Sequence, residues 1–215
     1  MFSCGNEKSV QLPKIGQSQI TEIKDVSPAY LFYDETKPDS VELNRKNLIS
    51  TTNWLVNADK RLTLKQVIPH IKFLQDKKKN SSHKKEGVKN YFTCNDTVNK
   101  NLGFIEFTDV NYHLESSEEY LSKLSTLEDS NNSIAIGFDN NGDITIVSTV
   151  LKSVLLKTKK DSLVNNLKKC DTTNGIIFLS FHKNLKYQDY ITYKSLISNI
   201  KFKETKLSIH EFLFN

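Results

Sequence analysis

An apolar strand that leads directly into a helix occurs twice in this chain, and this repetition constrains the fold more than any other feature. The first copy reads WLVNADKRLTLKQVIPHIKFLQDK (54–77), and the second reads IIFLSFHKNLKYQDYITYKSLISNI (176–200). In both, a compact apolar run is followed by apolar residues at helical spacing. Pro69 falls inside the first helix, where it removes a backbone donor, so we expect a kink or an early end there.

Three further pairs of segments match in the same order along the chain: TKPDS (36–40) with TKKDS (158–162), TTN (51–53) with TTN (172–174), and NLGFIEF (101–107) with KLSIHEF (206–212). The last pair aligns Glu106 with Glu211 and Phe107 with Phe212. Its spacing is shorter, which we interpret as an insertion of the basic loop 77–95 in the first copy. The pattern indicates an internal duplication, and the alternative is convergent patterning of unrelated strand–helix segments.

The predicted fold class is α+β, with two tandem, related small sheets that are each packed by two helices. The predicted parts are a polar N-terminal tether (1–27), a first half (28–114) with a short helix over 39–49, a linker helix (115–130) and a second half (131–215). We expect the second half to run strand, strand, helix, strand, helix, strand. Its first two strands meet at Asn141-Gly142, a pair that tolerates tight hairpin turns.

Composition narrows the class of partner. The chain is 37% hydrophobic, which suffices for a core, and its net charge of +5 is only mildly basic. The densest basic stretch, KKKNSSHKKEGVK (77–89), contains no aromatic residue, so we expect no nucleic-acid partner. A solvated loop is the first interpretation of this stretch, and contact with anionic lipid head groups or an acidic partner is the second.

The N-terminus reads MFSCGNEKS and resembles the end of a bacterial lipoprotein signal, where a lipid is attached to the cysteine. The resemblance implies a lipid on Cys4 and a periplasm-facing protein that is anchored in a membrane. The charged and apolar regions of a signal peptide do not precede it in this sequence. The alternative is an unmodified cysteine at a frayed terminus, in a cytoplasmic protein. No run of about 20 apolar residues occurs, so we expect no membrane-spanning helix.

Few residues are candidates for catalysis or metal binding. The five histidines form no HxH or HExxH pattern and the three cysteines form no CxxC pattern, so we expect no metal and no other cofactor. Cys94 and Cys170 either pair in an oxidising compartment or stay as two free thiols. A nucleophile pair of Cys170 and His182 is not expected, because Cys170 closes a helix whose dipole opposes a thiolate.

Two short motifs carry a family resemblance. A D-x-x-G-x-I turn occurs as DNNGDITI (139–146). A signature of an apolar strand ending in A-D-K, followed by a Tyr that opens the next helix, is divided between the copies. Ala58-Asp59-Lys60 matches its first part and Tyr187 its second, while His182 and Leu64 stand at the complementary positions. The second half thus resembles the periplasmic domain of the ExbD/TolR family of biopolymer-transport proteins.

The resemblance implies a soluble module that dimerises and contacts an energy-transducing envelope protein or peptidoglycan. The family's membrane helix, whose Asp takes part in proton flow, has no counterpart in this sequence, so we do not expect motor function to carry over. We predict a non-enzymatic cell-envelope binding or scaffold protein. The alternative is a soluble domain of unknown activity, including a hydrolase without a recognisable motif.

Edge strands of such domains accept a partner strand, because their unpaired backbone groups seek hydrogen bonds. The segment 206–214 is the predicted edge strand. Its candidate contact residues are Leu207, Ile209, Glu211 and Phe212. A homodimer is the other assembly that this edge would allow.

Overall fold

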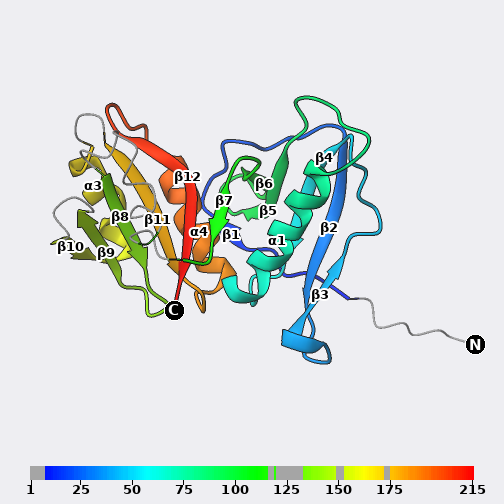
Figure 1. The fold of residues 1–215 in the computed structure, drawn as a ribbon, viewed down its shortest axis with the longest axis horizontal. Helices are drawn as coiled ribbons and strands as arrows, with labels where there is room; N and C mark the ends of the chain where they lie inside the picture. The colour runs from blue at the N-terminus through cyan, green and yellow to red at the C-terminus, as the bar shows by residue number, and fades with distance from the viewer. Residues whose placement is uncertain (1–7, 116–118, 120–132, 149–152, 172–174) are drawn as a thin grey trace, which may run out of the picture. The chain divides into compact units, whose positions relative to one another are not determined.

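A computed structural model of the chain describes residues 8–115, 119, 133–148, 153–171 and 175–215. The chain divides into two compact units, the first comprising 1–62 and 69–108 and the second 63–68 and 109–215. Within the described residues, each unit contains one six-stranded mixed sheet. The coarse prediction, an α+β chain with two similar sheets, is confirmed (Figure 1).

The first sheet is built around three parallel strands. Its members are β1 (Lys14–Ile15), β2 (Val26–Tyr33), β3 (Val41–Asn44), β4 (Asn53–Ala58), β5 (Asn90–Asp96) and β6 (Asn101–Glu106). Strands β2, β4 and β5 are mutually parallel, while β3 and β6 add antiparallel to the two ends. β1 pairs with the last two residues of β5.

Helix α1 (Leu64–Lys79) connects β4 to β5. It begins with a capping box, in which the Gln66 side chain accepts hydrogen bonds from the Thr63 backbone N–H (2.8 Å) and hydroxyl (2.9 Å). The helix continues through Pro69, so the expected early end is wrong. Its apolar face is fully buried, which stabilises the helix despite the missing backbone donor.

The predicted helix over 39–49 is also wrong. A 3₁₀ turn (Pro38–Ser40) occupies its start and β3 follows directly. Asp39 and Ser40 both adopt positive φ (55° and 53°), which excludes an α-helical N-cap at either residue. The first half therefore lacks its expected second helix within the described residues, and a β2–β3 hairpin takes its place.

The second sheet also combines parallel and antiparallel pairing. Its members are β7 (Asn111–His113), β8 (Ser133–Phe138), β9 (Ile144–Ser148), β10 (Ser153–Thr158), β11 (Ile176–His182) and β12 (Lys206–Phe214), in the spatial order β10-β9-β8-β11-β12-β7. Strands β8, β11, β12 and β7 are parallel, and β8, β9 and β10 form two successive hairpins. Helices α3 (Lys160–Lys169) and α4 (Tyr187–Ser198) precede β11 and β12.

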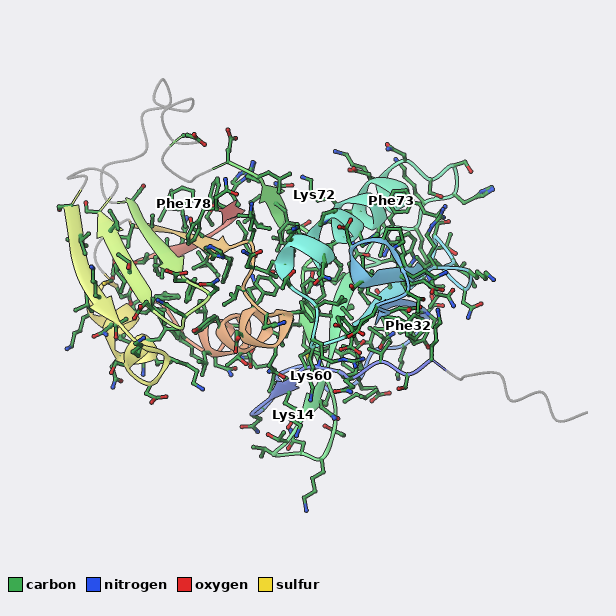
Figure 2. All side chains as sticks on the ribbon, turned by 90° about the horizontal axis from the view of Figure 1, so that it is seen from below. Lys14, Phe32, Lys60, Lys72, Phe73 and Phe178 are labelled. Atoms are coloured by element: carbon green, nitrogen blue, oxygen red, sulfur yellow. The ribbon has the colours of Figure 1, made fainter. Side chains whose placement is uncertain are left out.

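The core of the second unit lies between its sheet and these helices. Phe138 and Phe181 stack on each other, with ring centroids 4.8 Å apart, and contact Tyr193 and Tyr190 of α4. Alternation along β11 places Phe178 on the opposite face of the sheet, away from α3 and α4 (Figure 2).

The structure corrects three sequence-based assignments. β10 is an additional strand before α3, and β7 belongs to the second sheet although 111–113 was assigned to the first half. Residues 8–27 are not a free tether, since β1 pairs with β5 and Ile20 bridges to Phe104. Cys4 lies outside the described residues. The predicted linker helix (115–130) also lies outside them, apart from residues 115 and 119. No helix in the described part is long and apolar enough to cross a membrane.

The two sheets are similar, but one of the sequence alignments between the two halves is wrong. β12 follows α4 and pairs parallel with β11, just as β5 follows α1 and pairs parallel with β4. The topological counterpart of β12 is therefore β5, and matching Glu106 to Glu211 and Phe107 to Phe212 is wrong. Residues 77–79 end α1 and 90–95 belong to β5, so only 80–89 form the connecting loop.

Candidate functional site

The turn after β4 is organised by Asp59, one of the two family-signature residues. Its fully buried carboxylate accepts hydrogen bonds from the backbone N–H groups of Gln11 and Arg61, both at 3.0 Å. The Arg61 guanidinium adds a two-point ion pair (2.9 and 2.8 Å) and lies over the Tyr33 ring at 4.7 Å. Burial raises the pKa of this carboxyl, but these hydrogen bonds outweigh it and hold the pKa below its ordinary value.

The turn after β11 repeats this arrangement with different chemistry. His182 lies 123 positions after Asp59. Its Nδ1 accepts a hydrogen bond from the Asn184 backbone N–H (3.0 Å), as the Asp59 carboxylate does from the residue two positions on. The carbonyl of His182 also accepts from the Leu185 N–H (2.8 Å), matching the bond from Leu62 to Asp59 (3.1 Å). The two residues are equivalent turn caps, which gives the signature position a structural role.

Tyr187, the second family-signature residue, opens α4 as predicted and is fully buried. Its ring stacks with that of Tyr190 at a centroid distance of 6.2 Å. A fully buried tyrosine of this kind contributes packing. Tyr187 belongs to the second unit, whereas Asp59 belongs to the first.

A buried polar chain, which we call the Glu211 cluster, connects α4, β12 and β7. It consists of Glu211, Lys194, Tyr190 and Tyr112. Lys194 donates from Nζ to the Glu211 carboxylate, and Tyr190 donates from its hydroxyl to the same carboxylate at 2.8 Å. The Tyr112 hydroxyl lies 3.2 Å from that of Tyr190 and donates to it, since the Tyr190 proton is already committed. Burial raises the pKa of both tyrosine hydroxyls, and the Glu211 charge adds to this.

Two histidines meet on the other face of the same strands. His113 of β7 and His210 of β12 lie 97 positions apart in the sequence, and their Nε2 and Nδ1 atoms are 2.8 Å apart. The His113 ring stacks on Phe212 at 5.0 Å, and its Nδ1 is 3.9 Å from the Glu115 carboxylate. No short motif signals this pair, because neither histidine has a second one nearby in the sequence.

The predicted edge strand is covered by another strand over three of its nine residues. β12 lies between β11 and β7, and β7 pairs with His210, Glu211 and Phe212. Glu211 and Phe212 are buried and belong to the core. Leu207 and Ile209 are exposed (37% and 51%) and lie before the residues that β7 covers. β12 therefore lies inside the sheet at the residues that β7 covers.

The outer strand on the other side of the second sheet is β10. In the part of the chain that the structure describes, it pairs with β9 alone. Three consecutive apolar side chains, Val154, Leu155 and Leu156, are 56%, 48% and 37% exposed. A bulge between Val154 and Leu156 breaks the alternation of the strand. The sequence shows the apolar run 154–156 between two lysines. It does not show the alternation of apolar and polar residues that identifies a strand.

The remaining candidate residues are placed separately. Cys94 is buried in the first unit and Cys170 half-buried in the second; both thiols are free, and burial raises the pKa of each. Among the described residues, no three His, Cys, Asp or Glu side chains form a group that could hold a metal. In the basic stretch, Lys78 is half-buried. Its ammonium donates to the Lys89 carbonyl and the Asn90 amide oxygen, both at 2.9 Å, and burial lowers its pKa to about 8.

No family model, curated protein or solved structure matches this chain. The functional argument therefore depends on the geometry of the two units themselves.

Proposed function

We propose that the protein is a non-enzymatic binding or scaffold module, which takes up an extended segment of a partner protein at β10. The observation that carries this proposal is the exposed apolar edge formed by Val154, Leu155 and Leu156. An outer strand offers a row of backbone donors and acceptors to an incoming strand. Soluble proteins usually protect such edges, so an apolar one favours a binding role.

The chemistry of β10 defines the partner segment. Its exposed leucines and valine call for apolar side chains at alternate positions of the incoming strand. Lys157 stands at the end of this apolar run and is exposed. An acidic residue at the matching end of the partner segment would complement it. We therefore propose an extended, apolar segment with an acidic flank, supplied by a cell-envelope protein.

A lipid anchor is the second part of this proposal. The lipobox-like MFSC sequence would place a lipid on Cys4 and hold the module at a membrane surface. The strand and helix content of the second unit is compatible with an ExbD/TolR-like module, with β10 as an addition. The intact mass of protein isolated from its native host tests the anchor. A lipidated N-terminal cysteine is expected, and an unmodified Met1 at the start of the mature chain would overturn it.

The binding edge is tested by placing a photo-crosslinking amino acid at position 155 of the full chain in its native host. Crosslinked peptides are identified by mass spectrometry. We expect them to come from one apolar segment of a single envelope protein. Leu155→Lys should weaken that complex by at least about tenfold, since a buried charge exceeds the 1.4 kcal/mol that a tenfold loss requires. Val98→Lys is the matched control, because Val98 is 63% exposed in the first unit.

Two results would contradict the proposal. If crosslinks from position 155 lead only to other copies of this chain, the edge serves self-association and not partner capture. If Leu155→Lys and Val98→Lys bind the partner equally well, β10 is not the binding site. Circular dichroism of both variants must match that of the wild type, so that loss of binding is not a loss of folding.

A further inference from the structure

The end of the first unit at which α1 finishes carries the excess positive charge of the chain. Residues 72–89 hold seven lysines against Asp76 and Glu86, so their net charge of +5 equals that of the whole chain. This segment comprises the second half of α1 and the loop 80–89. Lysines in the last turn of a helix complement its dipole, but the loop lysines lie beyond the helix. Helix stability alone therefore does not account for the charge at this end.

Side-chain contacts bring the connection between β3 and β4 to the same end. The Arg45 guanidinium lies over the Phe73 ring of α1, 4.9 Å from its centroid. The Ile49 carbonyl accepts a hydrogen bond from the Trp54 indole N–H at 2.7 Å. The Lys78 ammonium lies over that same indole ring, 5.0 Å from its centroid. The connection from β3 to β4 is therefore packed alongside the second half of α1.

The loop 80–89 is held at this end as well. The backbone N–H of Lys89 donates to the side-chain oxygen of Asn53 at 2.8 Å, and the Lys85 ammonium pairs with the Asp25 carboxylate at 2.8 Å. Asn53 opens β4, and Asp25 directly precedes β2. The loop therefore lies against the first residues of two neighbouring parallel strands.

Three large apolar side chains are exposed on this same end of the first unit. The exposed fractions of Val26, Ile49 and Phe73 are 41%, 57% and 44%, and Phe73 lies on the exposed side of α1 (Figure 2). Exposed lysines lie in the same three segments. We call the surface formed by these side chains the basic–apolar patch; its members are Val26, Lys46, Ile49, Phe73, Lys77 and Lys84.

We propose that the basic–apolar patch binds the surface of an anionic lipid bilayer. Its lysines are attracted to the anionic head groups, and its three apolar side chains enter the boundary between head groups and acyl chains. A nucleic acid would satisfy the lysines, but its phosphate backbone offers nothing to the aliphatic side chains of Val26 and Ile49. A single lipid chain gives only weak membrane binding, and a basic surface is the kind of second signal that makes anchoring stable. The patch is independent of the segment bound at β10.

The test is sedimentation of the full chain with lipid vesicles, using a Cys4→Ser parent so that no attached lipid contributes. We expect binding to vesicles of equimolar phosphatidylcholine and phosphatidylglycerol, and none to phosphatidylcholine alone. Lys46→Gln/Lys77→Gln/Lys84→Gln should weaken binding about 100-fold, because each lysine near an anionic surface contributes about fivefold. Phe73→Gln should weaken it by about tenfold, since a half-exposed aromatic ring no longer enters the bilayer.

Two matched controls should bind as the parent does. Lys160→Gln/Lys168→Gln/Lys169→Gln removes the same charge from exposed positions of α3, and Leu102→Gln removes an apolar side chain that is 45% exposed. The proposal is overturned if the two triple variants lose binding equally, or if phosphatidylcholine alone binds the parent as well. It is also overturned if Phe73→Gln binds as tightly as the parent, which would assign the lysines to a soluble polyanion. Circular dichroism checks that every variant is folded.

Discussion

Replacing Lys194 by methionine would leave the buried carboxylate of Glu211 without its cation. Glu211 is 1% exposed and Lys194 8% exposed. Methionine keeps most of the aliphatic stem of the lysine, so the packing of α4 against the sheet changes little. The main loss is the ion pair, because the Tyr190 hydroxyl still donates to the carboxylate but carries no charge.

Removing one partner of a buried ion pair typically costs about 3–5 kcal/mol, since the other charge stays buried and uncompensated. We therefore expect Lys194→Met to lower the free energy of unfolding by about that amount. Lys194→Met/Glu211→Gln removes the uncompensated charge and keeps an acceptor for Tyr190. The double variant should recover a large part of the loss, although two residues are changed instead of one.

Urea unfolding followed by far-ultraviolet circular dichroism measures these differences. Hydrogen exchange of peptides from 187–198 and 206–214 assigns the change to α4 and β12. Lys201→Met is the matched control, because Lys201 is exposed and its replacement should change stability by no more than about 0.5 kcal/mol. The reasoning is refuted if Lys194→Met is as stable as Lys201→Met, or if the double variant is less stable than Lys194→Met.

Three further predictions concern residues outside the Glu211 cluster. Backbone N–H groups of 203–205 hold the pKa of Asp171 at about 2, below its ordinary 3.8. The Asp171 carboxylate therefore stabilises the fold above about pH 3.8, and this contribution is lost as the pH falls towards 2. Urea midpoints at pH 7, 4 and 2.5 should show a smaller acid dependence for Asp171→Asn than for the wild type. Gly103→Ala places a methyl group 2.6 Å from the Ser18 Cβ and should cost about 1–3 kcal/mol in the same assay. Asp59→Asn loses a two-point ion pair and leaves a buried amide among donors, so a loss of about 1–3 kcal/mol is expected, and an unchanged urea midpoint would contradict the cap assignment.

Sequence patterns predicted the elements whose burial is periodic. The helical spacing of Leu64, Val67 and Ile71 gave α1, and the hairpin between β8 and β9 followed from Asn141-Gly142. β5 was missed because six of its seven residues are buried. A strand covered on both faces has no alternation, and here it follows directly on a lysine-rich loop.

The contacts that define the candidate sites could not be read from the sequence, because they join distant positions. His113 and His210 are neighbours because β7 pairs with β12 in the second sheet and because β12 has a bulge opposite Phe178. The Glu211 cluster likewise depends on β7, which contributes Tyr112. The position of β10 at the edge of the sheet was not predicted for another reason. Apolar residues are usually buried, but the apolar run of β10 is exposed, and this exposure is the basis of the proposed binding site.

The turns after β4 and β11 are built in the same way in the two units. Asp59 and His182 make the same hydrogen bond to the backbone two residues on, although one acceptor is a carboxylate and the other an imidazole nitrogen. His182 accepts through a ring nitrogen, whereas Asp59 accepts through a carboxylate that also pairs with Arg61. A catalytic residue would not tolerate such an exchange of chemistry, but a turn cap does. The shared property is the hydrogen-bond acceptor at this position, which agrees with a structural role in both turns.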